Sequence, residues 1–436
     1  MTWRSVALED IAIDMQPGFA CQPTSDGGGV AQLRTNNVSA EGRIDLSEVK
    51  RVPATATQMH RYLLTPGDIL FNNTNSPALV GKTAFFDEPG EYVFSNHMTR
   101  IRLNRALAEP RYVGRFLHWA WAQGAFRSRV TQWVNQAAIN RSQLASVMVP
   151  LPPLSEQRRI VEILDQADRL RHLRTEADAK ADRILPALFI KMFGDPATNP
   201  KGWPRKRLGE LLNRIDSGWS PVCENRQAAP DEWGVLKLGA VTTNRYIESE
   251  NKALPTALDP RPELEVQPGD FLFTRKNTRE LVGACAYVER TRPRLLLSDL
   301  VFRLRLKANA EMHPLYLWAL MTSPSKRSSI EMLAGGSAGS MPNISKGRLE
   351  ALEIEKPPHV LQTGFSGTAA DVDSLTRKAR VARASIERSF AVLLHRAFTG
   401  ELTAKWREAH MTELLQEMEH QAKALQEVQM TGTEID

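Results

Sequence analysis

Several features that mark common protein classes are scarce in this chain of 436 residues. Its three cysteines, Cys21, Cys223 and Cys285, are too few and too scattered for a disulfide framework or a zinc cluster, which favours a reducing compartment. No apolar run approaches the roughly 18 residues that a membrane helix needs. The first residues lack the apolar core of a signal peptide. We therefore expect a cytoplasmic protein without a membrane partner.

Motifs of catalytic and cofactor-binding sites are missing as well. The sequence has no Asn-Pro-Pro-aromatic or Asp-Pro-Pro-aromatic motif of amino-methyltransferases, no glycine-rich cofactor loop and no phosphate-binding P-loop. The nine histidines never stand at metal-ligand spacing with cysteines or acidic residues. We therefore predict no catalytic residue, no metal site and no cofactor bound by this chain.

The overall composition is ordinary for a soluble globular protein, with 42% hydrophobic and 24% charged residues. The length is enough for two or three domains with proper cores. A net charge of +6 and a pI near 9.2 suggest a polyanionic partner, although many basic proteins bind none.

The sequence does contain a long internal repeat. An offset of 205 residues, without a gap, places Ile139 on Ile344 and Pro152-Pro153 on Pro357-Pro358. Upstream, the frame Pro-Gly-Asp followed later by Leu-Val-Gly also occurs twice. A repeat of about 200 residues is too long for a solenoid, whose periods are roughly 20–50 residues. The sequence therefore predicts two related domains, arranged about a pseudo-twofold axis.

Each copy has the same order of parts. A β-rich stretch with short alternating runs, such as Thr99-Arg100-Ile101-Arg102-Leu103, leads through a proline connector into a long helix. Within the first β-rich part, residues 110–133 look helical and mostly buried. We place the two β-rich domains, the two connectors with their spacer helices, and a C-terminal tail at 1–150, 200–355, 151–195, 356–400 and 401–436.

The first spacer is predicted to be one continuous helix. Ser155 provides an N-cap hydroxyl, and apolar residues recur at steps of three and four from Ile160 to Met192, which is typical of a narrow coiled-coil seam. Pro186 is expected to kink the last turns, and Gly194-Asp195-Pro196 ends the helix.

The second spacer carries a seam in phase with the first, from Phe365 to Ala397. The two helices are most simply packed against each other. A helix of about 39 residues is roughly 58 Å long, so an antiparallel pair would hold the two β-rich domains far apart and inverted. The tail at 401–436 has an apolar stripe on an acidic helix, which could dock on another subunit or cover this chain's own helices.

Two loops at matched places differ in chemistry although their frame is kept. The first has amides and a hydroxyl, and the second is basic: Asn72, Asn73, Thr74 and Asn75 against Arg275, Lys276, Asn277 and Arg279. Amide side chains read adenine edges, arginine reads guanine, and Lys, Ser or Thr hold phosphates. Two readers of different short DNA sequences should differ in this way. The alternative is that Asn, Thr and Ser simply populate turns.

Further candidates come from two other loop pairs and one lysine. Small or amide residues beside Lys or Arg allow close approach to a phosphate backbone. These candidates are Asn135, Gln136 and Arg141 in the first copy against Ser337, Ser340, Asn343 and Lys346 in the second, then Arg34 and Asn36 against Lys237, and finally Lys82. A lone basic residue in a strand is more often a solvated edge residue, so that alternative stays open for Arg34, Lys237 and Lys82.

At this point the chain resembles a known family. Pro150-Leu151-Pro152-Pro153-Leu154-Ser155-Glu156-Gln157 before a long helix is similar to the conserved spacer of type I restriction–modification specificity subunits. Met192-Phe193-Gly194-Asp195-Pro196, followed by Trp203-Pro204 and Leu208-Gly209-Glu210-Leu211, carries the same resemblance. It covers nearly the whole chain in family order. The second connector departs from it, because Lys356-Pro357-Pro358-His359-Val360-Leu361-Gln362 replaces the usual Leu-Pro-Pro-Leu-x-Glu-Gln.

The resemblance implies an α+β fold, with two pseudo-symmetric β-rich target recognition domains separated by two long antiparallel coiled-coil helices. It also implies that each domain binds one half of a split double-stranded DNA sequence and that the chain is not itself an enzyme. Such subunits recruit two methyltransferase subunits that bind S-adenosylmethionine and methylate adenine, and motor-nuclease restriction subunits join them. The alternatives are a self-contained DNA methyltransferase or nuclease with an unfamiliar site, and a scaffold that binds no DNA.

Overall fold

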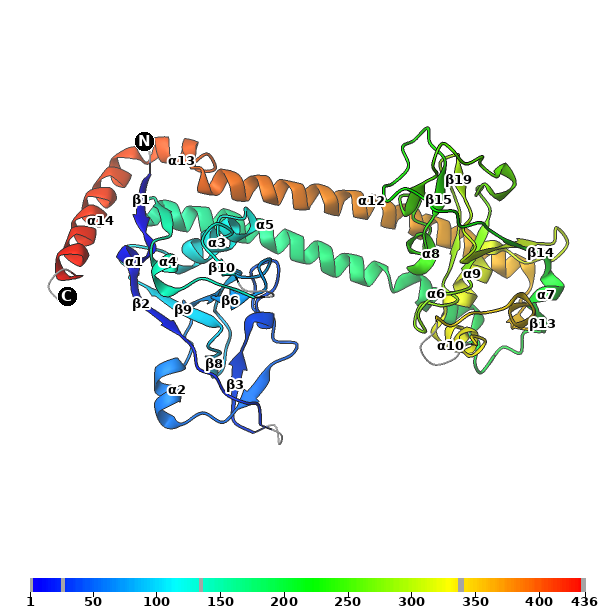
Figure 1. Cartoon of the computed structure of the whole chain (residues 1–436), viewed down its shortest axis with the longest axis horizontal. Coiled ribbons are helices and arrows are strands. Elements are labelled where there is room, and N and C mark those ends of the chain that lie inside the picture. Colours follow the sequence, from blue (N-terminus) through cyan, green and yellow to red (C-terminus); the bar gives the residue numbers. More distant parts are fainter. Residues whose placement is uncertain (1–2, 25–27, 133–135, 336–340, 433–436) are drawn as a thin grey trace. The chain divides into compact units, whose positions relative to one another are not determined.

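The computed structural model describes residues 3–24, 28–132, 136–335 and 341–432. The chain forms two compact units, coloured by sequence in Figure 1. The first unit comprises Met1–Leu173 with Arg383–Asp436, and the second comprises Arg174–Ala382. Each unit therefore contains one β-rich part and a piece of both spacer helices. The chain is α+β, as the sequence predicts.

The elements of the first unit, in chain order, are β1 (Arg4–Ala7), α1 (Leu8–Ile11), β2 (Ala12–Pro17), β3 (Val30–Leu33), the 3-10 helix η1 (Thr35–Asn37), β4 (Lys50–Val52), α2 (Ala56–Tyr62), β5 (Ile69–Asn72), β6 (Thr74–Asn75), β7 (Thr83–Phe85), β8 (Tyr92–Phe94), β9 (Met98–Leu103), α3 (Pro110–Ala122), β10 (Thr131–Gln132), β11 (Ala137–Ala138), α4 (Arg141–Ala145), β12 (Met148–Leu151), α13 (Ala404–Ala409) and α14 (Met411–Gly432).

The elements of the second unit are α6 (Ile184–Phe193), β13 (Arg205–Arg207), α7 (Leu208–Leu211), β14 (Leu212–Ser217), β15 (Gly234–Leu236), α8 (Gly239–Thr242), β16 (Asn251–Ala253), η2 (Pro262–Leu264), β17 (Phe271–Thr274), β18 (Cys285–Tyr287), β19 (Leu295–Leu296), β20 (Val301–Leu306), α9 (Pro314–Thr322), α10 (Pro324–Met332), α11 (Lys346–Glu350) and β21 (Glu353–Glu355). Two helices belong to both units: α5 (Leu154–Ala181) and α12 (His359–Phe398).

The two larger sheets of each unit correspond strand by strand. The order β2-β9-β5-β7 in the first matches β14-β20-β17-β18 in the second, and every neighbouring pair is antiparallel. A smaller sheet, β4-β3-β8, matches β16-β15-β19, and each contains one parallel pair. Even the register shift recurs, between Ala12 and Asp14 and between Leu212 and Arg214. The sequence repeat is therefore a repeat of structure.

The helix predicted over 110–133 is shorter in the structure. It ends at Ala122, and Gly124 adopts a φ of +76°, which L side chains rarely adopt. Thr131 and Gln132 form a strand paired with β11 instead. Helix α3 packs its buried face on the sheet, with Tyr112 and Leu117 fully or almost fully buried in the core of the first unit.

The first spacer is not the one continuous helix that the sequence predicts. Helix α5 ends at Ala181, and α6 begins at Ile184 and ends at Phe193, before Gly194 with a φ of +82°. The break falls at Asp182, four residues before Pro186. A proline ring collides with the carbonyl group of the residue four positions earlier, and proline has no N–H to donate to that carbonyl oxygen. The second spacer has no such proline, and α12 runs unbroken for 40 residues.

Ser155 is not the helix cap. Helix α5 already includes Leu154, and the backbone N–H of Ser155 donates to the Glu417 carboxylate in the tail, at 3.0 Å. The predicted seam is also incomplete. Ile160 is fully buried, but Leu170 and Leu173 are 62% and 50% exposed. These two positions of the predicted seam are therefore not buried.

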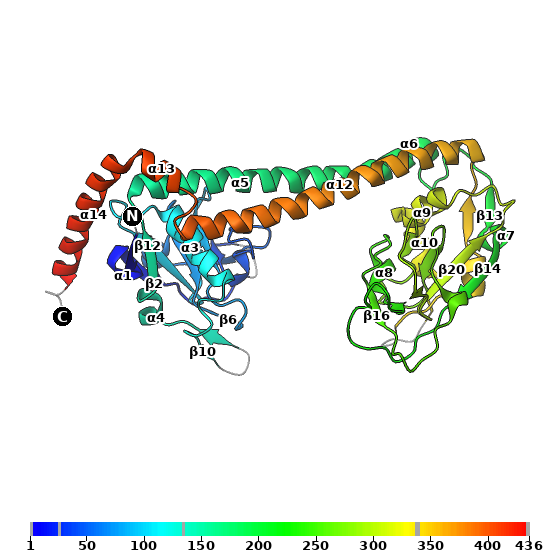
Figure 2. The ribbon, with the colours of Figure 1, turned by 90° about the horizontal axis from the view of Figure 1, so that it is seen from above.

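In each unit the spacer helices run antiparallel (Figures 1 and 2). In the first, Arg171 of α5 pairs with Glu387 of α12 at 2.6 Å and lies over the Phe390 ring, while Ile160 joins the same core as Phe398. In the second, Phe193 of α6 packs edge-on against Phe365, near the start of α12. This agrees with the antiparallel pairing that the sequence predicts.

The C-terminal tail covers part of the first unit, as one of the two interpretations of its apolar stripe expects. Leu414 and Leu425 of α14 are buried, and Gln421 donates to the carbonyl oxygen of Leu107 at 2.8 Å. Figure 1 shows α14, in red, beside α1 and β1. The tail is therefore part of the unit that contains the N-terminus.

Candidate nucleic-acid interface

Three loop segments of the first unit, predicted separately from the sequence, lie together. The side-chain amide of Asn72 donates to the Thr35 carbonyl oxygen at 3.1 Å, which joins the loop after β5 to η1. Strand β6 pairs with β11, and the Ile139 N–H donates to the Asn73 carbonyl oxygen at 2.9 Å. Polar residues from three distant parts of the sequence thus form one surface.

Three of the predicted contact residues support this surface from within. Asn72 is fully buried, and Asn73 is buried with its amide nitrogen donating to Asn96 O and Thr99 Oγ1. Lys82 is also buried, and its ammonium donates to the Val38 carbonyl oxygen. Burial lowers the pKa of Lys82. These side chains hold the loops in place.

The other first-unit candidates are more accessible. Asn36, Gln136 and Arg141 are exposed, whereas Arg34, Thr74 and Asn75 are half-buried. Asn75 accepts a hydrogen bond from the N–H of Ser76 at 2.8 Å, which is the turn-forming role that the alternative interpretation gave to such residues. Asn135 lies outside the described residues.

The corresponding segments of the second unit also meet. Ile344 N–H donates to the Arg275 carbonyl oxygen at 2.8 Å, and Lys276 forms a β-bridge with Asn343. Asn277 is buried, and its side-chain amide lies 3.5 Å from Thr242 Oγ1 at the end of α8. The loop after β17, the segment before α11 and the α8 segment therefore form a surface equivalent to that of the first unit.

Two basic side chains of this surface share one aromatic ring. The Arg275 guanidinium lies 5.2 Å from the centroid of the Phe302 ring, and its Nε donates to Asn343 Oδ1 at 3.2 Å. The Lys346 ammonium lies 5.8 Å from the same centroid and donates to the Ile215 carbonyl oxygen at 2.6 Å. Phe302 and Asn343 thus fix the position of Arg275.

The remaining second-unit candidates differ in their freedom. Arg279 is exposed and Lys276 is half-buried. Lys237 is exposed but paired with Glu250 at 2.9 Å. Ser337 and Ser340 lie outside the described residues.

The repeated Leu-Val-Gly frame has a steric reason. Gly81 and Gly283 have φ angles of +92° and +79° and follow the variable loops directly. A Cβ atom on Gly81 would lie 2.6 Å from the Phe126 ring, and one on Gly283 would lie 2.3 Å from Ile330. Only glycine therefore fits at the end of each loop, where the backbone passes close to a neighbouring side chain. The side chains within the loop are not restricted in this way and can differ.

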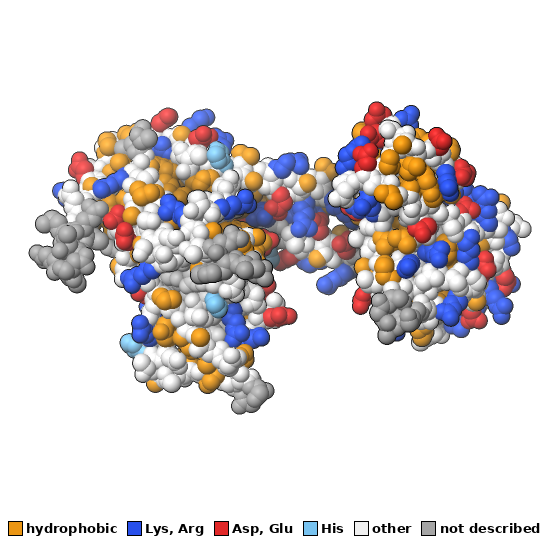
Figure 3. Space-filling model, in the orientation of Figure 1, with side chains coloured by type: hydrophobic (Ala, Val, Ile, Leu, Met, Phe, Trp, Pro, Cys, Tyr) orange, Lys and Arg blue, Asp and Glu red, His pale blue; other side chains and the backbone are white. Residues whose placement is uncertain are grey.

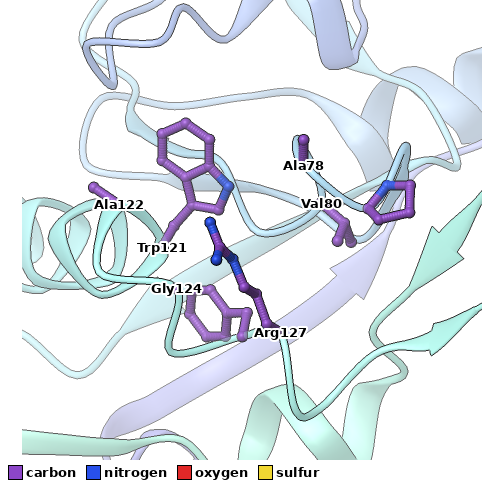
Figure 4. Close-up of a pocket in the computed structure, with 8 residues that line it drawn as sticks. Ala78, Val80, Trp121, Ala122, Gly124 and Arg127 are labelled. Atoms are coloured by element: carbon purple, nitrogen blue, oxygen red, sulfur yellow. The ribbon is translucent and has the colours of Figure 1, made fainter. Parts of the chain in front are cut away.

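A hollow of about 290 Å³ lies beside the first-unit loop. Figure 4 shows it between Ala78 and Val80 on one side and the Trp121 indole and Arg127 on the other. Sequence reasoning missed Trp121 and Arg127, because the predicted helix over 110–133 placed Trp121 among buried residues. Phe302 was missed as well, since its alternating strand predicts a core residue and gives no sign of Arg275 above it.

On the face shown in Figure 3, Lys and Arg side chains are scattered over each unit among acidic and hydrophobic ones. The positive net charge is not gathered into one basic patch on this face. Across residues 3–24, 28–132, 136–335 and 341–432, no cluster of three His, Cys, Asp or Glu side chains suits a metal ion. In the same part of the chain, no helix combines the length and apolarity needed to cross a bilayer.

Comparisons with known proteins agree on one family. Residues 2–181 match the model of the type I restriction modification DNA specificity domain. The chain is 36% identical over 198 residues to the EcoEI specificity subunit of Escherichia coli, and the match covers 45% of this chain and only 33% of that relative. It is 23% identical to the putative MjaX specificity subunit of Methanocaldococcus jannaschii, over 92% of this chain and 94% of the relative.

The fold has a solved counterpart. The type I restriction–modification S subunit from M. genitalium is similar with a TM-score of 0.55 at 12% identity, covering 91% of this chain and 96% of that one. Residues 2–181 thus match the type I restriction modification DNA specificity domain, and the chain as a whole is similar to type I specificity subunits.

Proposed function

We propose that this chain is the DNA-reading subunit of a type I restriction–modification complex. Each unit binds one half of a bipartite double-stranded DNA target through its three-loop surface. The chain contributes no catalytic residues and recruits two methyltransferase subunits, which bind S-adenosylmethionine, with motor-nuclease subunits added for restriction. It works in the cytoplasm, where the DNA is.

One observation carries the proposal: the two units hold unlike polar loops in the same frame. The corresponding strands β5 and β17 end at Asn72 and Thr274. Asn73 and Arg275 come next, and matched glycines follow both loops. A structural loop under the same packing constraints has no reason to change from amides to cations. Two readers of different base sequences do, because amides and guanidinium groups suit different base edges.

Exposed apolar side chains on the spacer helices support the recruitment of protein partners. Leu170 and Leu173 in the first unit are 62% and 50% exposed, and Leu375 and Val381 in the second are 64% and 70% exposed. Leu170 and Leu173 are one helical turn apart and so are neighbours on the surface of α5, and grouped exposed apolar side chains mark sites where other proteins bind.

The direct test is methylation mapping in a host that carries this chain and its partner methyltransferase. We expect a split motif with two defined halves and an unspecified middle. Exchange of residues 1–150 for the matching domain of a relative should change one half and leave the other. A change in both halves would contradict separable recognition domains.

The spacing between the halves tests the spacer helices. Insertion of four residues near Ala177 adds about 6 Å to α5 and turns its end by about 40°. Six ångströms is close to two base-pair steps of roughly 3.4 Å, so both halves should persist with a longer middle. An unchanged spacing in an active variant would show that the helices do not set it.

The two alternatives separate from the proposal by simple assays. A self-contained methyltransferase would transfer methyl groups without a partner subunit. A scaffold that binds no DNA would show no retention of random duplex DNA on filters at low salt. A DNA-binding chain should bind and lose affinity steeply as salt rises, because phosphate contacts release counterions.

A further inference from the structure

We propose that Arg275 reads a guanine base in the second half of the target, and that Asn343 and Phe302 position it for that purpose. This inference rests on the proposed function and names the residue that determines specificity at one base pair. It assigns different work to the neighbouring Arg279, which contacts the phosphate backbone.

The Arg275 side chain is held in one orientation by Phe302 and Asn343. Its flat guanidinium lies over the flat Phe302 ring, 5.2 Å from the centroid, and its Nε is engaged by Asn343 Oδ1 at 3.2 Å. Arg275 N–H donates to Leu300 O at 3.0 Å, so the backbone is fixed by the adjacent strand. A side chain that is already ordered loses little entropy on binding, and base readout depends on such fixed geometry.

The contact with Asn343 leaves two donor groups of Arg275 available. The hydrogen bond from Nε leaves the two terminal amino groups of the guanidinium. These groups have no hydrogen-bond partner in the part of the chain that the structure describes. Two parallel N–H donors at the end of arginine match the O6 and N7 acceptors of guanine in the major groove. Neither adenine nor a pyrimidine presents two acceptors in this way.

The matching positions of the first unit hold a different pair of residues, Asn73 and Thr99. Strand pairing places Phe71 against Thr99 and Phe273 against Phe302, so Asn73 corresponds to Arg275 and Thr99 to Phe302. There the Asn73 amide donates to the Thr99 hydroxyl at 3.0 Å and is buried. The two positions differ together. In the second unit an arginine, Arg275, lies over an aromatic ring, Phe302, whereas in the first unit a buried amide, Asn73, is bonded to a hydroxyl, Thr99.

Arg279 lacks every one of these constraints. It is exposed, and it makes neither an ion pair nor a ring contact with any residue that the structure describes. A mobile cation at the end of a loop suits phosphate oxygens, which need charge but no particular orientation. The same loop therefore offers a fixed reader and a free electrostatic contact.

The experiment compares four full-length variants with the unchanged chain, each assembled with the partner methyltransferase. They are R275K, R275A, N343A and R279A. Methylated sites are mapped in host DNA, and affinity is measured on duplexes that carry every base at each position of the second half. R275K keeps the charge and removes the fork, so it separates base readout from simple attraction.

We expect R275A and R275K to accept other base pairs at one G·C position, with discrimination there falling roughly ten- to hundredfold. N343A should relax the same position by a smaller factor, because it frees Nε without removing the arginine. R279A should keep the motif and flatten the salt dependence of binding by about one unit. The first half of the motif should stay unchanged in all four, which shows that each variant is folded and assembled.

Two results would overturn the inference. One is a uniform loss of affinity of R275A for all duplexes, with a flatter salt dependence, since Arg275 would then contact phosphate. The other is an unchanged motif and affinity. Failure of the proposed function would look different, because the unchanged chain itself would then show no sequence preference in either half.

Discussion

The two units fasten the start of their spacer helices in the same way and differ in the residue before the shared glutamine. In both, a fully buried glutamine fastens the helix to the recognition domain. Gln157 accepts from the N–H of Glu109 at 2.7 Å and donates to Pro152 O at 2.8 Å. Gln362 accepts from the N–H of His313 at 2.8 Å and donates to Pro357 O at 2.8 Å.

The residue before the glutamine is Glu156 in the first unit and Leu361 in the second. Glu156 has no exposed surface, and its carboxylate accepts from Trp3 Nε1 at 3.1 Å, Thr403 Oγ1 at 2.6 Å and Arg407 Nε at 2.8 Å. Leu361 is 38% exposed. The first unit is built from two separate segments of the chain, and Glu156 links them through Trp3 and Arg407. The second unit is one continuous segment, Arg174–Ala382, and has no such link to make.

Replacement of Glu156 should have the largest effect. In E156L, which copies the second unit, the Arg407 guanidinium, 11% exposed, is left buried without its carboxylate. Removal of one partner of a buried ion pair costs about 3–5 kcal/mol. Amide hydrogen exchange should show this loss of protection in the first unit alone.

The control for that variant is L361E, which places an acid at a partly exposed position and should change protection in the second unit by no more than about 0.5 kcal/mol. Equal losses in the two units would show that Glu156 is not specific to closure of the first.

Removal of the two glutamines should have unequal effects. In Q157A the carbonyl oxygen of Leu107 keeps a second donor, Gln421 at 2.8 Å. In Q362A, the described part of the chain leaves Glu311 O and Pro357 O without a replacement donor. An unsatisfied buried group costs about 1–3 kcal/mol, so Q362A should lower the free energy of unfolding more than Q157A does. A larger loss in Q157A would argue against the supporting role of the tail.

Acid should weaken the first unit more than the second, where burial and the neighbouring His359 also lower the pKa of His313. Burial lowers the pKa of His118 from 6.5 to about 4. Since the folded state resists protonation, the unfolded state binds more protons between pH 6.5 and 4, and stability falls as pH falls through this window. Between pH 7 and 5 the loss should be about 1–2 kcal/mol.

The corresponding residue of α9 is Thr322, which does not titrate and donates to Trp318 O at 2.8 Å. Hydrogen exchange measured at pH 7 and pH 5 should therefore separate the units, and H118F should remove the difference. A pH dependence that persists in H118F would assign it to other groups.

The smallest effect is expected for Lys237, whose pair with Glu250 is half exposed. Exposed pairs contribute about 0–1 kcal/mol, so K237A should leave unfolding nearly unchanged. If Lys237 contacts phosphate, the salt dependence of DNA binding should flatten by about one unit. An unchanged salt dependence would leave Lys237 as the solvated edge residue of the alternative interpretation.

The repeat, the α+β class and the antiparallel spacers were predictable because they depend on periodicity and on motifs that lie close together in sequence. The burial of Asn73 and Lys82 was not, because it depends on Thr99 and Val38, which only the folded sheet brings near. The break of the first spacer was half predictable. Pro186 was recognised as a kink, but the effect of its ring falls one turn earlier, at Asp182.

The candidate site shows the same limit. Sequence alone showed that the loop at Arg275 differs from its twin, since comparison of two copies needs no structure. It could not show that Asn343, 68 residues away, orients that arginine. Contacts of this kind are set by strand pairing, which local patterns do not report.

The junction of Trp3, Glu156 and Arg407 also dictates an order of events during synthesis. The recognition domain of the first unit leaves the ribosome before the second unit, yet Arg383–Asp436, which belong to the first unit, leave only after the whole second unit. Folding of the second unit needs only residues between 174 and 382, so it finishes earlier. Until Arg383–Asp436 have emerged, the Glu156 carboxylate lacks Thr403 and Arg407, and the apolar surface that α14 covers stays open to chaperones and to aggregation.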